Sequence, residues 1–297
     1  MIRMQYRILL LGFLILSLGC EKKTDEKLLL PERNLSQNFK NYWFSGEAEI
    51  TSYKLDQTRY GESRPGTAVL IFVTEDFLPE SQVKANSQNK SNIPVLKLNA
   101  TKNFITGIYP YSIMQSTFFP LEGNSHALKI TTSIQEWCGQ VYMQLNNRSD
   151  FEIKSHSYFE GEADHELNLD KTYLENEIWT LLRIDPEQLP TGSIQMVPSF
   201  EYIRLDHTEI KAYQATAEFY QDKELSVYKI TYPELNRNLK IYYHNSFPFR
   251  IEKWEETTER DGKKDVTTAT KMVEIKSAYW NKNSNNHLHL RDTLNLN

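Results

Sequence analysis

The sequence predicts a mainly β protein of the α+β class, in which a large curved antiparallel sheet or half-barrel surrounds one inserted amphipathic helix. Three observations lead to this fold class. Apolar and polar residues alternate with a period of two along much of residues 42–281, as in half-buried strands. Aromatic residues, with Tyr the commonest, make up 12% of the chain and favour strands. Only residues 171–183 place apolar side chains at helical spacing.

The chain begins with the pattern of a secretion signal. Arg3 and Arg7 form a positive flank, and the apolar run over residues 8–18 has the length of a signal-peptide core. A membrane-spanning helix needs about 20 such residues. The run is therefore too short to remain across a bilayer as a permanent span.

Residues 16–20, with the sequence LSLGC, resemble the lipobox of bacterial lipoproteins, in which a small residue precedes an obligatory Cys. The family usually has Leu three residues before the Cys, where this chain has Ser17. The resemblance implies cleavage after Gly19, a thioether between Cys20 and diacylglycerol, and acylation of the new amino group. Two or three acyl chains together anchor a soluble domain firmly. The alternative is an ordinary cleaved signal, or an N-terminal anchor, in which Cys20 is incidental.

The predicted organisation has four parts. Residues 1–19 form the signal peptide, and residues 20–41 form the lipidated Cys followed by a disordered tether that has too few apolar residues to order itself. Residues 42–281 form a single β-rich domain, and residues 282–297 form a polar, Asn-rich tail that is expected to fray. Glu21 follows the Cys, and by analogy with Gram-negative sorting signals this residue favours the outer membrane. The predicted location is the cell envelope, on either face of that membrane.

Composition limits the partners and the chemistry. Removal of Arg3 and Arg7 with the signal peptide leaves 32 basic and 39 acidic residues, a net charge of −7. No basic block or tail is present, so nucleic acid is not an expected partner. The expected partners are the membrane, through the N-terminal lipid, and an envelope protein or lipid. With Cys20 acylated, Cys138 has no disulfide partner and is expected to be a small buried hydrophobic residue.

The elements of the first half are predicted in order. Residues 42–55 alternate as a half-buried strand, and residues 67–73 are apolar on both faces, as in a central strand. Residues 79–92 form a polar loop, and residues 95–121 have strand composition broken by prolines. Residues 128–147 form a further strand with one apolar and one polar face.

The second half opens with the helix predicted over residues 171–183, with Asp170 as its N-cap and Asp185-Pro186 as its end. A single helix can bury its apolar stripe only against the sheet. This arrangement resembles, in strand order alone, the half-barrel of periplasmic lipoprotein carriers. Strand-like segments then resume at residues 193–205, 209–220 and 225–232. Further along the chain, Asp261-Gly262 is a strong signal for a hairpin turn.

Catalytic signatures are absent from the sequence: it contains no G-x-S-x-G, H-E-x-x-H, Walker A, G-x-G-x-x-G or C-x-x-C motif. We therefore predict no catalytic residue, no cofactor and no metal. Glu47 and Glu49 share one face of a strand, as glycosidase carboxylates can, although exposed strands often carry this pattern. Residues 160–166 collect four carboxylates without the spacing of a calcium loop. His287 and His289 offer two metal ligands at most and are expected to be solvated.

The polar and aromatic face of residues 128–147 is the candidate ligand-binding or interaction face. Buried polar groups need partners, so such a face either contacts water or lines a cleft. Cross-strand pairing on a solvated sheet explains the same pattern equally well. The candidate residues are Gln140, Tyr142 and Gln144, joined from other strands by Tyr228, Tyr232, Tyr242 and Trp254.

Residues 42–77 and residues 135–148, QEWCGQVYMQLNNR, resemble a family of Gram-negative outer-membrane lipoproteins of unknown function, and the resemblance runs through most of the mature chain. Members of this family often carry the label septum formation inhibitor Maf. Maf proteins are smaller cytosolic nucleotide pyrophosphatases with an S-x-S-P-R-R motif, which this chain lacks. Residues 62–65, ESRP, have the same residue types in another order. A Maf-type label would therefore be a misannotation.

Three functions remain as hypotheses. The first is a non-catalytic, membrane-anchored envelope lipoprotein that acts as a docking module, and a contiguous exposed apolar patch would favour it. The second is a binder or carrier of an apolar or amphipathic ligand, which requires a cleft of several hundred cubic ångströms between sheet and helix. The third is an envelope glycan hydrolase, which requires two carboxylates about 5 to 9 Å apart in a cleft.

Overall fold

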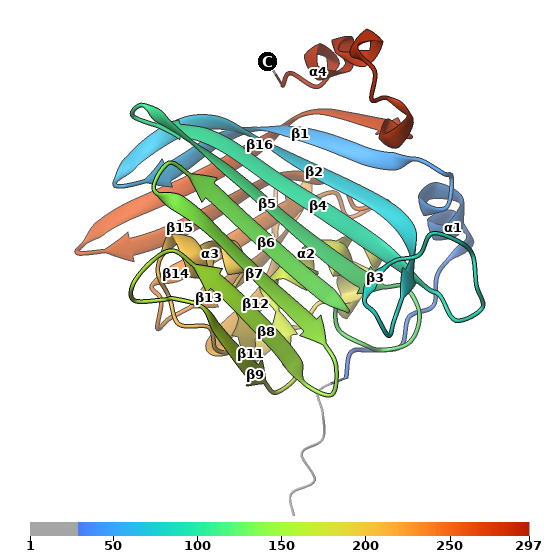
Figure 1. The fold of residues 1–297 in the computed structure, drawn as a ribbon, viewed down its shortest axis with the longest axis horizontal. Coiled ribbons are helices and arrows are strands. Elements are labelled where there is room, and N and C mark those ends of the chain that lie inside the picture. Colours follow the sequence, from blue (N-terminus) through green and yellow to red (C-terminus); the bar gives the residue numbers. More distant parts are fainter. Residues whose placement is uncertain (1–28, 297) are drawn as a thin grey trace, which may run out of the picture.

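The computed structural model describes residues 29–296, and within this range the chain forms one sheet of 16 strands (Figure 1). Strands make up 54% of the described residues and helices 14%. The prediction of a mainly β protein with a large, open, curved antiparallel sheet is confirmed. The predicted signal peptide and Cys20 lie outside the described residues.

The strands follow the order β10-β11-β12-β13-β14-β15-β16-β1-β2-β4-β5-β6-β7-β8-β9 across the sheet, with β3 paired to β2. All neighbours are antiparallel except β10 and β11. Their bounds are β1 Ala48–Arg59, β2 Glu62–Leu78, β3 Val83–Lys84, β4 Ile93–Thr106, β5 Tyr109–Pro120, β6 Lys129–Glu136, β7 Gly139–Asn147, β8 Phe151–Ser157, β9 His165–Leu169, β10 Tyr173–Leu174, β11 Gly192–Val197, β12 Tyr213–Asp222, β13 Leu225–Tyr232, β14 Arg237–Tyr243, β15 Ile251–Arg260 and β16 Lys263–Ser277.

The helices of the described residues are short. They are α1 Gln37–Trp43, α2 Glu175–Ile184, α3 Phe200–Leu205 and α4 His289–Thr293, with single 3₁₀ turns at Pro186–Gln188, Tyr279–Asn281 and Asn285–His287. The sheet curves around α2 and α3, which lie on its concave side (Figure 1). The two edge strands, β9 and β10, are consecutive in the chain. Only residues 170–172 separate them, so a short connection joins the two edges of the sheet.

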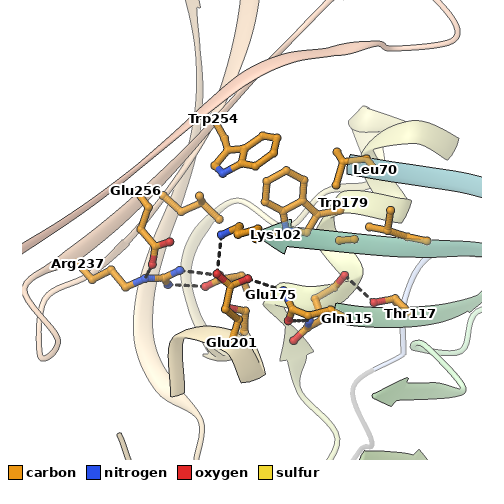
Figure 2. Close-up of a pocket in the computed structure, with 15 residues that line it drawn as sticks. Leu70, Lys102, Gln115, Thr117, Glu175, Trp179, Glu201, Arg237, Trp254 and Glu256 are labelled. Carbon is orange, nitrogen blue, oxygen red and sulfur yellow. Dashed lines mark hydrogen bonds and ion pairs between the residues drawn. The ribbon is translucent and has the colours of Figure 1, made fainter. Parts of the chain in front are cut away.

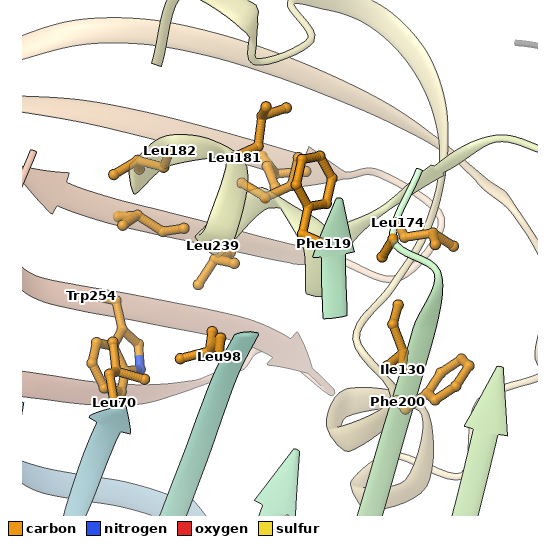
Figure 3. Packing of buried hydrophobic residues seen from close by; sticks show 14 of the residues in the cluster. Leu70, Leu98, Phe119, Ile130, Leu174, Leu181, Leu182, Phe200, Leu239 and Trp254 are labelled. Atoms are coloured by element: carbon orange, nitrogen blue, oxygen red, sulfur yellow. The ribbon is translucent and has the colours of Figure 1, made fainter. Parts of the chain in front are cut away.

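The core lies between the concave face of the sheet and α2. Alternate side chains of β4, β5 and β6 point inward, and α2 contributes Leu181 and Leu182 to the same cluster (Figure 3). Trp254 from β15 and Leu239 from β14 reach this cluster from the opposite part of the sheet. Because the sheet wraps around the helix, one contiguous core joins strands that are far apart in the sequence.

The predicted helix is present but begins at Glu175 instead of residue 171, because residues 173–174 pair with β11 as β10. The segment predicted as a strand over residues 193–205 divides into β11 and helix α3. Helix α3 starts there because Ser199 caps it: its hydroxyl accepts a hydrogen bond from the backbone N–H of Tyr202, as N-cap residues do. The strand predicted over residues 128–147 is the β6–β7 hairpin.

Both ends of the described chain are more ordered than predicted. The predicted tether extends to residue 41, yet Leu30 and Phe39 are buried and α1 is capped by Ser36. Phe39 is one helical turn before Trp43, so both rings of α1 pack into the core. At the other end Leu294 follows α4 and packs on the convex side of β1 and β2. Apolar side chains therefore order two segments whose overall composition is polar.

Gly66 permits the close approach of β2 and β4. A Cβ atom at this position would lie 2.8 Å from Cβ of Phe104 and against the carbonyl oxygen of Asn103. We expect Gly66→Ala to lower the free energy of unfolding by about 1–3 kcal/mol, as overpacking does, measured by urea unfolding. Gly161→Ala is the control, because open space surrounds that position. Equal stability of the two variants would contradict this account of the β2–β4 contact.

Candidate functional site

A small cavity lies inside the curved sheet, between β4, β5, β14 and β15 on one side and α2 and α3 on the other (Figure 2). Its volume is about 50 Å³. Small-molecule sites typically have volumes of about 300–1,000 Å³, so this space is much smaller than a ligand pocket. Trp179 and Trp254 form its apolar wall, and charged side chains form its floor.

The charged floor is built around Arg237 of β14, whose side chain is 1% exposed. Its guanidinium donates to both carboxylate oxygens of Glu175, over 2.6 and 2.7 Å, and its Nε donates to Glu256 over 2.6 Å. The Tyr232 hydroxyl donates to Glu175 over 2.8 Å. The helix residue Glu175 is thus attached to two strands by charge-assisted hydrogen bonds, which are stronger than neutral ones.

A second ion pair borders the same cavity. Lys102 of β4 lies 2.6 Å from Glu201 of α3, and Gln115 donates to the other Glu201 oxygen over 2.8 Å (Figure 2). Burial raises the pKa of Glu201, and Lys102 offsets only part of this effect. Burial acts in the same direction on Glu256, but there the Arg237 charge outweighs it and lowers the pKa. Opposite pKa shifts in one cluster follow from the different cations beside the two carboxylates.

This cluster does not form the site of a glycan hydrolase. Glu175, Glu201 and Glu256 are each held by a cation within hydrogen-bonding distance. A cavity of about 50 Å³ is also much smaller than the roughly 300–1,000 Å³ of pockets that bind small molecules. The arrangement instead joins α2 and α3 to the sheet.

A third buried pair joins the other end of α2 to β1. Arg183 donates to the two oxygens of Glu49 over 2.5 and 2.7 Å and to the carbonyl of Pro248 over 2.8 Å. Burial raises the pKa of Glu49, but the Arg183 charge outweighs it and the pKa is lowered. Glu47 is exposed, whereas Glu49 is 1% exposed. The possible carboxylate pair of Glu47 and Glu49 is therefore not formed.

Sequence reasoning did not find these buried charges. Helix α2 also buries Glu177, which lies 2.7 Å from His126 and accepts from the backbone N–H of Ala127. Charged residues in a helix usually indicate its solvated face. Here the only available signal was that Glu175 and Glu177 are close to the apolar stripe at the start of the helix.

The predicted interaction face is divided among three places. Gln140, Tyr142 and Gln144 lie on the outer face of β7, where the Tyr142 hydroxyl donates to Gln144 over 2.7 Å and Gln144 donates to Asn146 over 2.5 Å. These side chains form a hydrogen-bonded row on a solvated sheet. The cross-strand alternative, which the sequence left open, describes them better than a cleft does.

The other predicted members lie elsewhere. Tyr228, Tyr232 and Trp254 point into the core and are at most 2% exposed. Tyr242 pairs with Val227, next to the Tyr228–Ile241 pair, so it belongs to the opposite face of β14. The structure therefore does not bring the seven predicted residues together.

Cys138, the acidic loop and the two C-terminal histidines lie outside the lining of the interior cavity. Cys138 is exposed in the β6–β7 turn instead of buried, since a turn there ends the strand that would have covered it. In the acidic loop, Glu162 is held by His207 and Ser157. His287 and His289 are in the C-terminal segment, and within residues 29–296 no three His, Cys, Asp or Glu side chains gather closely enough to hold a metal ion.

Large apolar side chains are exposed at the turns of four successive hairpins at one end of the sheet. The β1–β2, β4–β5, β6–β7 and β8–β9 connections all lie at this end, because the strands are antiparallel. We call this set the hairpin-tip surface; its members and exposed fractions are Tyr60 61%, Ile105 59%, Ile108 82%, Trp137 68% and Tyr158 68%.

Aromatic contacts link Tyr60 and Trp137 of the hairpin-tip surface through the buried Tyr111 and the half-buried Tyr109. Ile105 lies on the opposite face of β4 from Phe104, which stacks on Tyr111. The Tyr60 hydroxyl lies 2.8 Å from that of Tyr111, and the rings of Tyr111 and Tyr109 are 6.0 Å apart. The Tyr109 ring is in turn 6.2 Å from that of Trp137. Tyr158 covers the next turn, where its side chain packs over the backbone of Gly139. In the sequence, Tyr60 and Ile108 each stand directly beside a turn glycine, a local signal that a period-two pattern does not contain.

Comparisons with known proteins identify no relative. No protein-family model matches the chain, and no curated protein and no solved structure is significantly similar to it. None of the helices in the described part of the chain is both long enough and apolar enough to cross a membrane.

Proposed function

We propose that this chain is a non-catalytic lipoprotein, anchored in the outer membrane through Cys20, whose β domain docks a partner protein of the cell envelope through the hairpin-tip surface. The observation that supports this proposal most directly is the exposure of five large apolar side chains along one rim. Contiguous exposed apolar patches are rare on monomers and are typical of interaction sites. Trp and Tyr are also the residues that most often dominate binding energy in interfaces.

A protein partner is favoured over the anchoring bilayer by the position of the surface. Near the N-terminal end of the described chain, the backbone N–H of Leu30 donates to Asn124. Asn124 lies between the end of β5 and the start of β6, whereas Ile108 and Trp137 lie at the other ends of these strands. The predicted lipid attachment therefore leads to the opposite end of the domain from the hairpin-tip surface. The charge along the rim is also mixed, without the basic cluster that favours anionic lipid.

The packing of the interior is a reason to prefer docking to lipid transport. A carrier of a long lipid acyl chain needs an apolar cleft of several hundred cubic ångströms. The space between the sheet and α2 is about 50 Å³ and has a charged floor, and the larger pocket beside α3, about 290 Å³, is lined in part by Glu162, Arg204 and Glu209. The third hypothesis, glycan hydrolysis, has no support from carboxylates that are each paired with a cation.

The test is site-specific photocrosslinking in intact cells. A photoreactive benzoylphenylalanine at Ile108 is expected to form one discrete crosslinked product with an envelope protein. The same residue at Phe44, which is 48% exposed at the opposite end, is expected to form none. The captured protein is then purified and its affinity measured by calorimetry. We expect the double variant Ile108→Ser, Trp137→Ser to bind at least about thirtyfold more weakly, since a hot-spot residue contributes 2 kcal/mol or more.

The controls separate docking from its alternatives. Phe44→Ser should bind the captured protein like the wild type, and the thermal midpoints of both variants should match that of the wild type. Binding to vesicles of outer-membrane phospholipid that depends on Ile108 and Trp137 would show a membrane contact instead and would overturn the proposal. A crosslink only to a second copy of the chain would overturn it as well.

A further inference from the structure

Arg204 of α3 is a buried cation that forms no ion pair with any residue in the range 29–296, and the nearby Glu162 charge acts on it only from a distance. Its side chain and backbone together are only 3% exposed. Its Nε and Nη1 are completely buried and have no hydrogen-bond partner among the described residues. The guanidinium carbon lies 4.0 Å from the centre of the Phe159 ring, which covers one face of the group without accepting a hydrogen bond in its plane.

Two other buried arginines, Arg183 and Arg237, each have a carboxylate partner, which Arg204 lacks among the described residues. Arg183 and Arg237 are similarly buried, and each forms two hydrogen bonds with the two oxygens of one glutamate. A buried charge is costly unless it is paired and hydrogen-bonded. Burial accordingly lowers the pKa of Arg204, whereas the carboxylate partner of Arg237 keeps the pKa of that residue high despite its burial. Among the described residues, Arg204 thus has no carboxylate partner of the kind that Arg183 and Arg237 have.

The carboxylates near Arg204 already have other partners. Each is held by a hydrogen bond or an ion pair that does not involve Arg204: Glu162 by His207 and Ser157, Asp206 by Arg260, Glu136 by the Cys138 backbone N–H, and Glu209 by Lys211. No side chain of the described chain therefore supplies the counterion in this conformation.

Arg204 lines a pocket of about 290 Å³ between the inner side of β7 and β8, the end of α3 and the acidic loop. At about 30 Å³ for each water-sized group, the pocket has room for about ten such groups. Met143, Ile203 and Ile210 provide apolar walls, and Ser155 and Thr208 provide hydroxyl groups. The lining also includes His165 and His207. Apolar walls on one side and a buried guanidinium with unsatisfied nitrogens match a ligand with an oxyanion at one end and a short apolar body.

We propose that this pocket binds an anionic amphiphile whose singly charged carboxylate or phosphodiester head group pairs with Arg204 while its alkyl body packs on Met143, Ile203 and Ile210. The head group carries one charge, because Glu162 and Glu209 border the same pocket and repel a dianion. The site is separate from the hairpin-tip surface, and its existence does not depend on docking there.

The experiment measures ligand binding by equilibrium dialysis with the full-length protein held in lipid nanodiscs, with empty nanodiscs as the blank. The probes are octanoate, octyl methyl phosphate and uncharged octanol. We expect saturable binding of at least one anionic probe at one site for each chain. Arg204→Gln should weaken that binding at least tenfold and leave any octanol binding unchanged. The anionic probe that binds more tightly identifies the head group as a carboxylate or a phosphodiester.

Two controls make every outcome decisive. Arg148→Gln removes one positive charge from the β7–β8 turn at the far end of these strands and should bind like the wild type. The thermal midpoint of Arg204→Gln should equal or exceed that of the wild type, because an unpaired buried charge is removed. Absence of saturable binding of both anionic probes would overturn the proposal. Failure of Arg204→Gln to fold would also overturn it, by showing that the guanidinium is needed for the structure.

Discussion

Replacing Glu49 by Gln is expected to lower the free energy of unfolding by about 3–5 kcal/mol at pH 7, the range found when one partner of a buried ion pair is removed. Arg183, buried from solvent, would keep its charge but lose the neutralising carboxylate and one of the two hydrogen bonds to it, because the amide NH₂ of Gln cannot accept from the guanidinium. Its guanidinium would retain the Pro248 carbonyl and the faces of the Trp43 and Phe72 rings. These groups do not neutralise the charge.

Urea unfolding of three variants tests this expectation. Glu47→Gln is the matched control, since Glu47 is exposed two residues earlier and its loss should change stability by less than about 0.5 kcal/mol. The double variant Glu49→Leu, Arg183→Met should recover much of the loss, because well-packed apolar residues often replace a buried ion pair without cost. A loss below about 1 kcal/mol for Glu49→Gln would show that water or another group satisfies Arg183.

The same pair determines a pH dependence with a definite sign. The pKa of Glu49 is lowered from its ordinary value of 4.5 in the folded protein. Its contribution to stability is therefore complete above pH 4.5 and is lost as the pH falls through the lowered pKa. The difference in stability between the wild type and Glu49→Gln should accordingly be constant near neutral pH and shrink in strong acid. A difference that grew on acidification would contradict the assignment.

Replacing Arg237 by Gln is the second large effect, again about 3–5 kcal/mol. The change would leave Glu175 without its bidentate partner and remove the cation that lowers the pKa of Glu256. Both carboxylates line the interior cavity. Because protonation relieves an unpaired Glu256 carboxylate, the loss relative to the wild type should be smaller at pH 4 than at pH 7.

Chemical denaturation at the two pH values measures this effect. Arg64→Gln is the control, because Arg64 forms its ion pair with Glu62, which is 67% exposed, and exposed pairs contribute about 0–1 kcal/mol. Arg237→Lys should be intermediate, since an ammonium group keeps the charge but cannot form the fork of three hydrogen bonds. Equal stability of Arg237→Lys and the wild type would show that charge alone, without hydrogen-bond geometry, maintains the cluster.

Three buried ion pairs link the interior to the strands that carry the proposed docking surface. Arg183 joins α2 to β1, and Glu175 joins the start of α2 to β14. Glu201 joins α3 to β4, the strand that leads to the exposed Ile105. The charged interior thus holds the helices and the strands in one register, and the hairpin tips project from the strands that it connects.

Local patterns predicted the elements that depend on near neighbours. Alternation predicted strands, Asp261-Gly262 predicted the β15–β16 turn, and apolar spacing predicted α2. The same patterns failed where a few residues override composition: Ser199 starts a helix inside a predicted strand, and Cys138 lies in a turn. The predicted interaction face failed because the β7 residues face outward while Tyr228, Tyr232 and Trp254 of β13 and β15 face the core, and which face of each strand is concave is set by the curvature of the whole sheet.

By itself the sequence determined the class of the fold and most of its strands, because a period of two and turn residues act over a few positions of the chain. Only the tertiary structure decided which charges are buried and which of them are satisfied. Arg183 meets a carboxylate 134 positions away, whereas Arg204 meets none, and nothing local in the sequence distinguishes these two arginines. The physical reason is that Coulomb pairing depends on distance in space, and the curvature of the sheet sets that distance.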